Sequence, residues 1–143
     1  MNMRFEDTRS GQLPIRFLCA LAFAAALGLT LVMALVPHPP ELPMAVSDKA
    51  QHAIAFAVLA GLGACAWPRR LVQIAVVLII IGGLIEILQM IPILHRDAEF
   101  ADWATDVAAT LTTLLIVRLI QGKRASAALA EPDGPIFEPI PRA

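Results

Sequence analysis

Charged side chains are scarce in this sequence: they make up 16% of its residues, whereas 58% are apolar. The mean hydropathy of +0.72 exceeds what a soluble domain of 143 residues could hide from water. The composition therefore excludes an ordinary soluble protein and predicts a membrane protein. It leaves no room for a second globular domain, so any chemistry must come from the helices and their short connections.

Net charge and cysteine are scarce as well. The formal net charge is −1, and no basic stripe lies between the apolar runs, which argues against a nucleic-acid partner. Two cysteines are present, Cys19 and Cys65, each inside an apolar stretch toward the predicted cytoplasmic half. We therefore expect small packing residues here rather than a disulfide.

Four apolar runs are long enough to cross a bilayer as α-helices. At about 1.5 Å per residue, a run of about 20 residues matches a hydrocarbon layer of about 30 Å. We predict an all-α, four-helix transmembrane bundle with helices over residues 17–36, 50–67, 71–91 and 101–120. The first run is longer than the core of a signal peptide and is expected to be retained. Ser47 or Asp48 is placed to cap the second helix, whose small residues predict a central position.

The basic residues fall mainly on one side of the predicted membrane, which predicts cytoplasmic N- and C-termini. The expected organisation is a cytoplasmic segment 1–16, a membrane domain 17–120 and a disordered, proline-rich cytoplasmic tail 121–143. The chain is thus predicted to be a multi-pass protein of the inner (plasma) membrane. Nine of the eleven basic residues lie on this side: Arg4, Arg9, Arg16, Arg69, Arg70, Arg118, Lys123, Arg124 and Arg142.

Polar and ionisable side chains gather near the opposite, outer face. A carboxylate facing lipid at this depth would cost about 2 to 3 kcal/mol or more, so we expect Glu86 to face the bundle interior. A spacing of four residues puts Asp48 and His52 on one helix face, and likewise Asp102 and Asp106. We therefore predict one ligand-binding cluster built from separate helices. Its members are Asp48, Lys49, His52, Glu86, Gln89, Arg96, Asp102 and Asp106.

Structural roles compete with ligand binding at each of these positions. The aspartates at helix starts could cap those helices, and the lysine could extend to lipid head groups. The histidine could be a packing residue, and the carboxyl and amide groups of the third helix could form interhelical hydrogen bonds. Arg96 could simply contact lipid phosphate.

The outer-face residues occur in a defined order: Asp48, Lys49, His52 and Phe56, then Glu86 and Gln89, then Arg96, Asp102 and Asp106. This ordered set resembles the VanZ-like family of small membrane proteins, over residues 48–120, about half of the chain. Asp106 stands where many members have asparagine, and Ala109 and Thr113 stand where glycine is frequent. The resemblance implies a cell-envelope membrane protein, and some relatives are linked to resistance to glycopeptide antibiotics such as teicoplanin.

Three hypotheses for function remain open. In the leading one, the cluster binds the head group of a membrane lipid, glycolipid or lipid-linked wall precursor, with Lys49 and Arg96 on phosphate and the acidic and amide groups on hydroxyls. In the second, the chain is a membrane enzyme acting on lipid-linked phosphates, with Glu86 or His52 as general base, although no Gly-x-Ser-x-Gly or His-Glu-x-x-His motif is present. In the third, it is a proton-coupled carrier or a partner subunit, for which four helices would require a homo-oligomer. The residue spacing specifies no cofactor and no metal.

Overall fold

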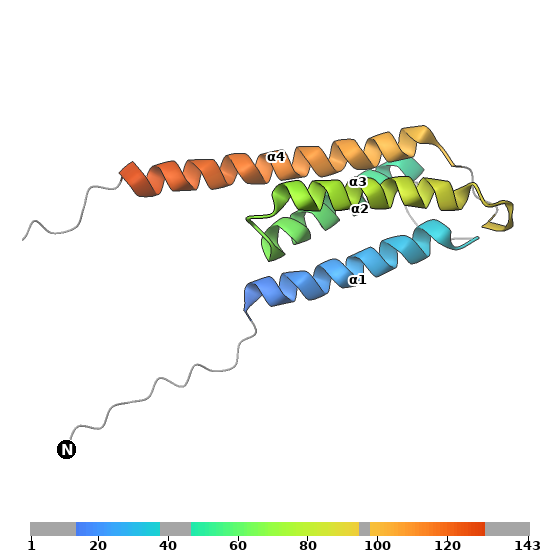
Figure 1. Ribbon diagram of the computed structural model, residues 1–143, viewed down its shortest axis with the longest axis horizontal. Helices are drawn as coiled ribbons and strands as arrows, with labels where there is room; N and C mark the ends of the chain where they lie inside the picture. Colours follow the sequence, from blue (N-terminus) through green and yellow to red (C-terminus); the bar gives the residue numbers. More distant parts are fainter. Residues whose placement is uncertain (1–13, 38–46, 95–97, 131–143) are drawn as a thin grey trace, which may run out of the picture.

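The computed structural model describes residues 14–37, 47–94 and 98–130, and over these residues all regular secondary structure is helical (Figure 1). The predicted all-α class is confirmed. The elements are α1 (Ile15–Leu35), α2 (Asp48–Ala66), α3 (Leu71–Gln89), the short 3-10 helix η1 (Pro92–Leu94) and α4 (Phe100–Ala130).

Each of the four α-helices is long and apolar enough to cross a membrane. A helix of 19 residues, such as α2 or α3, extends about 28 Å at about 1.5 Å per residue, close to the thickness of the hydrocarbon core. Large aliphatic side chains cover the outside of the bundle: Val72 of α3 is 70% exposed and Leu115 of α4 is 57% exposed. Such a surface suits lipid rather than water. Together with the four apolar helices, it indicates a multi-pass membrane protein.

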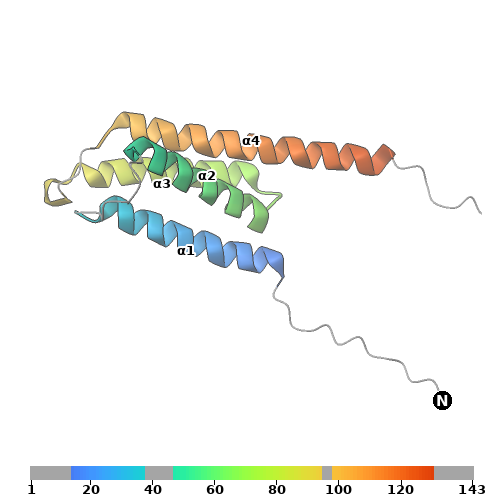
Figure 2. The ribbon, with the colours of Figure 1, turned by 180° about the vertical axis from the view of Figure 1, so that it is seen from behind.

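The second helix lies in the middle of the bundle and packs most extensively against α4 and α1. Figures 1 and 2 show α1 and α4 on opposite sides, with α2 and α3 between them. Small residues such as Ala60 and Ala64 let the neighbouring helices approach α2, as the sequence predicts. The buried core is completed by Phe56, Leu59, Leu78, Ile85 and Leu114.

Both ends of the bundle can be followed in the ribbon (Figure 1). The start of α1, the turn between α2 and α3, and the end of α4 lie at one end, whereas α2 and α4 begin, and α3 ends, at the other. Helices α2 and α4 therefore run in the same direction. Ser47 caps α2, because its Oγ accepts a hydrogen bond from the amide of Ala50 at 3.3 Å.

The last helix is longer than predicted. It continues past Ile120 to Ala130, so the first ten residues of the segment expected to be a disordered tail are helical. Alanine, lysine, arginine and glutamine dominate this stretch and are strong helix formers, whereas Gly122 alone costs about 1 kcal/mol. The prolines that motivated the prediction begin only at Pro132, and residues 131–143 lie outside the described part of the chain.

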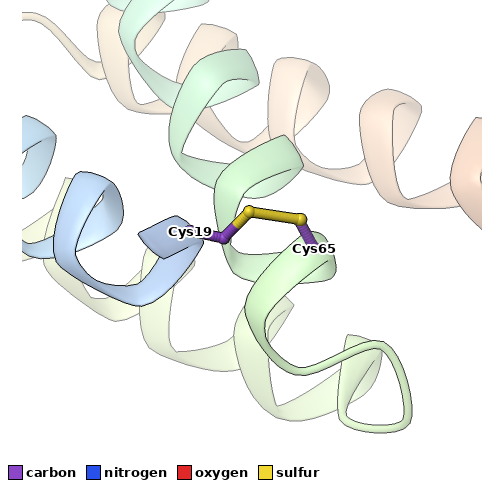
Figure 3. The surroundings of a disulfide bond; sticks show 2 residues. All are labelled: Cys19 and Cys65. Atoms are coloured by element: carbon purple, nitrogen blue, oxygen red, sulfur yellow. A yellow bond between two sulfur atoms is a disulfide. The ribbon is translucent and has the colours of Figure 1, made fainter. Parts of the chain in front are cut away.

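A disulfide joins Cys19 of α1 to Cys65 of α2, so the expectation of two unlinked packing residues is wrong (Figure 3). Because α1 and α2 are antiparallel, the first turns of α1 lie beside the last turn of α2. The two Cα atoms are 6.0 Å apart, within the range that a disulfide spans. The rings of Phe23 and Trp67 join the same two helices edge to face, with centroids 5.6 Å apart.

Gly82 of α3 lies directly against Asp106 of α4. A Cβ atom at this position would lie 3.0 Å from Oδ2 of Asp106 and 3.4 Å from Cζ of Phe56. The carboxylate of Asp106 is fully buried, and its other oxygen is held by His52, so it cannot move away without lengthening that contact. The absence of a side chain at Gly82 is therefore what admits Asp106 to the bundle interior.

We predict that Gly82→Ala lowers the free energy of unfolding by about 1 to 3 kcal/mol, because the new methyl group overpacks the contact with Asp106. Gly61→Ala is the matched control, since a Cβ there meets nothing within 4 Å. The control should be neutral or stabilising by up to about 1 kcal/mol. Reversible unfolding in mixed detergent micelles measures the stability of both variants. Equal stabilities would contradict the conclusion that Gly82 makes room for Asp106.

Candidate functional site

Polar side chains from α2, α3, α4 and the residue before α4 gather toward the end of the bundle where α2 and α4 begin and α3 ends. We refer to this group as the polar cluster. It comprises Asp48, Lys49 and His52 of α2, Glu86 of α3, Glu99 just before α4, and Asp102, Asp106 and Thr110 of α4.

The innermost contact of the polar cluster joins His52 to Asp106. Nδ1 of His52 lies 3.0 Å from Oδ1 of Asp106, and the two side chains are 10% and 0% exposed. The contact forms because α2 and α4 are parallel. One turn separates Lys49 from His52 on α2, and one turn separates Asp102 from Asp106 on α4. Lys49 therefore lies level with Asp102, and His52 lies level with Asp106. A carboxylate on one ring nitrogen fixes the orientation of the imidazole.

Lys49 lies one turn nearer the end of the bundle, between two carboxylates. Its ammonium nitrogen is 2.5 Å from Oε2 of Glu99 and 3.3 Å from Oδ1 of Asp102. The hydrogen bond and the Coulomb attraction from Lys49 hold the pKa of Glu99 below its ordinary value. Lys49 is thus engaged by protein carboxylates instead of extending freely to lipid.

Glu86 and Gln89 of α3 have different partners. Glu86 accepts a hydrogen bond at 2.9 Å from the backbone amide of Glu99, and it lies within electrostatic range of His52, Asp102 and Asp106. Gln89 instead donates a 2.9 Å hydrogen bond to the carbonyl of Ala34 in α1. This bond joins α3 to α1, which is the interhelical role that the sequence offered as an alternative to ligand binding. It does not connect Gln89 to the polar cluster.

Of the eight predicted residues, the structure brings six together. Arg96 lies outside the described residues, and Gln89 bonds α1. The predicted ligand-binding cluster did not include Glu99 and Thr110. The sequence places Thr110 one turn beyond Asp106 on the same helix face, and its hydroxyl is buried without a hydrogen-bond partner among the described residues. Glu99 precedes its helix and acts partly through its backbone, which leaves no signal in sequence spacing.

Four buried oxygens of the polar cluster have no hydrogen-bond partner within the described residues. A buried acceptor without a donor costs about 1 to 3 kcal/mol. Oδ1 of Asp102 has the ion-pair contact with Lys49 at 3.3 Å but no hydrogen bond. The other three are Oε1 of Glu86, Oδ2 of Asp106 and Oγ1 of Thr110. The site thus presents unused acceptors to a proton, a hydroxyl, an ammonium group or a cation.

Negative charge dominates the polar cluster. Its five carboxylates face one ammonium group and one imidazole among the described residues. Asp48, His52 and Asp102 bring ligand atoms within 4.8 Å of one another, a set that could hold a divalent cation. Carboxylate and imidazole ligands suit several divalent ions, so the donor set does not select one metal.

Comparison of the chain with protein-family models, with curated proteins and with solved structures finds no match.

The contact between His52 and Asp106 should show energetic coupling. We predict that a double-mutant cycle with His52→Ala and Asp106→Ala gives a coupling free energy of about 0.5 to 3 kcal/mol, measured by unfolding in detergent micelles. Thr105→Ala replaces Asp106→Ala in the control cycle, because the Thr105 hydroxyl bonds the carbonyl of Ala101 in its own helix. Additive effects of His52→Ala and Asp106→Ala would show that the two groups do not act together.

Proposed function

We propose that this chain is a VanZ-like protein of the cell envelope whose polar cluster binds the head group of a membrane lipid, glycolipid or lipid-linked wall precursor. The proposal extends to a link with glycopeptide antibiotic resistance through the family resemblance. The observation that carries it is the set of buried oxygens without a donor, contributed by α3 and α4 near one end of the bundle.

The chemistry of the polar cluster favours a head group rich in hydrogen-bond donors. Carboxylate oxygens accept but do not donate, and the ammonium of Lys49 is already engaged by Glu99 and Asp102. Sugar hydroxyls or a primary amine would supply the missing donors, whereas a bare phosphate would be repelled by the surrounding carboxylates. A glycosylated head group therefore fits better than a simple phosphate ester.

The orientation that we propose places the polar cluster on the non-cytoplasmic side of the plasma membrane. Lys49 is the one described lysine or arginine at the end that carries the cluster. Six others lie at the opposite end, which the positive-inside rule assigns to the cytoplasm together with both chain termini. They are Arg16, Arg69, Arg70, Arg118, Lys123 and Arg124.

One contact favours a second candidate function, an enzyme acting on lipid-linked phosphates. His52 is held by a buried carboxylate in the manner of a general base and its orienting partner. In that case His52→Ala abolishes release of inorganic phosphate from a polyprenyl pyrophosphate supplied in micelles. If the unaltered chain binds the head group but releases no phosphate, the binding function holds and the enzymatic function is excluded.

The binding function predicts that single amide replacements weaken head-group retention. With the full chain in vesicles containing a glucosyl-diacylglycerol, we expect Glu86→Gln and Asp102→Asn each to lower affinity about ten- to a hundredfold, the loss of one charged hydrogen bond. Native mass spectrometry of the detergent-released protein counts the retained glycolipid. Thr105→Ala is the control, since its hydroxyl is satisfied within α4. Unchanged retention in both amide variants would refute the proposal.

The proposed orientation can be tested with single cysteines at positions 38, 69, 96 and 130 in a Cys19→Ala, Cys65→Ala background. We expect positions 38 and 96 to react with a membrane-impermeant maleimide in sealed cells, and positions 69 and 130 only after permeabilisation. The reverse pattern would overturn the orientation. It would also put the Cys19–Cys65 disulfide toward the oxidising side, where disulfides usually persist.

A further inference from the structure

A pocket of about 740 Å³ opens at the basic end of the bundle, opposite the polar cluster. It lies between the α2–α3 turn and the last part of α4, and its lining includes Arg69, Arg70 and Arg118. Gln121 donates a 3.4 Å hydrogen bond to the carbonyl of Pro68 and so holds α4 against the turn. The extension of α4 past Ile120 supplies Gln121 and Gly122 to the wall, so the pocket depends on the unexpected length of this helix.

The three arginines of this pocket face no carboxylate among the described residues. Within the described residues none of them takes part in a salt bridge, and every described carboxylate belongs to the polar cluster at the other end. Lys49 contrasts with them, because two carboxylates neutralise it. The pocket therefore concentrates positive charge on guanidinium groups that no described carboxylate neutralises.

Apolar surface adjoins these guanidinium groups. Leu71 and Val72 also line the pocket, and the side chain of Val72 is 70% exposed. The α2–α3 turn is where the chain leaves one apolar span and enters the next, so the pocket lies at the level where lipid head groups meet acyl chains. A ligand that fits both features carries an anionic phosphate joined to a hydrocarbon chain.

We propose that this basic pocket binds the phosphate head group of an anionic phospholipid, with Arg69, Arg70 and Arg118 as its ligands. Guanidinium groups pair with phosphate through parallel hydrogen bonds, and basic pockets between transmembrane helices are a known form of lipid recognition. The exposed side chain of Val72 beside them takes the start of an acyl chain. The site is separate from the polar cluster, so the inference does not depend on the proposed function.

The experiment compares the full chain in nanodiscs of phosphatidylcholine with and without phosphatidylglycerol, with retained lipid counted by native mass spectrometry. We expect selective retention of phosphatidylglycerol, and a loss of about fivefold in affinity for each of Arg69→Gln, Arg70→Gln and Arg118→Gln. Arg118→Lys should recover part of this loss because it keeps the charge. Thermal unfolding of each variant confirms that it is folded.

Arg124→Gln is the matched control, because Arg124 has the same charge and lies on the same helix outside the pocket lining. Its affinity for phosphatidylglycerol should stay within about twofold of the unaltered chain. An equal loss in Arg124→Gln would mean that the general field of the basic end attracts the lipid, and would overturn the site. Displacement of phosphatidylglycerol by inorganic phosphate at equal concentration would overturn the lipid as the ligand.

Discussion

Asp106 is a carboxylic acid in the interior of an apolar bundle, and the arrangement of α2, α3 and α4 follows from the need to accommodate it. A buried ionisable group is costly unless the surrounding protein supplies partners. Helix α2 supplies His52 at 3.0 Å, and α3 supplies space at Gly82, where a Cβ would lie 3.0 Å from the second carboxylate oxygen. These contacts fix the register of the three helices and so set the level at which the other acidic groups meet.

Acidic and basic side chains of the described residues lie at opposite ends of the bundle. All described carboxylates gather at one end, where Lys49 and His52 neutralise part of their charge. The arginines, which pair with none of these carboxylates, gather at the other end. The proposed functions divide in the same way. The acidic end offers acceptors and suits a ligand that donates hydrogen bonds, whereas the basic end offers donors and suits an anionic phosphate.

Helix α4 connects these two ends. Its first turns carry Asp102 and Asp106, and its last turns carry Arg118 and Gln121, so one rigid element contributes to both sites. Other contacts keep it in place along the way. The indole of Trp103 donates a 3.1 Å hydrogen bond to the carbonyl of Ile79, beside the gap left by Gly83. The helix therefore cannot shift along α3 without breaking contacts at several levels.

Local patterns in the sequence predicted the four apolar helices, a cap on α2 at Ser47 or Asp48, the central position of α2 and six members of the polar cluster. These features depend on composition and on the helical period, which act over a few residues. Tertiary structure decided the Cys19–Cys65 disulfide, the bond from Gln89 to the Ala34 carbonyl and the pairing of His52 with Asp106 in preference to other carboxylates. It also brought the end of α4 against the α2–α3 turn. Each of these contacts joins atoms from different parts of the chain. The distance between such atoms depends on how the helices pack, and residue spacing along a single helix does not determine that packing.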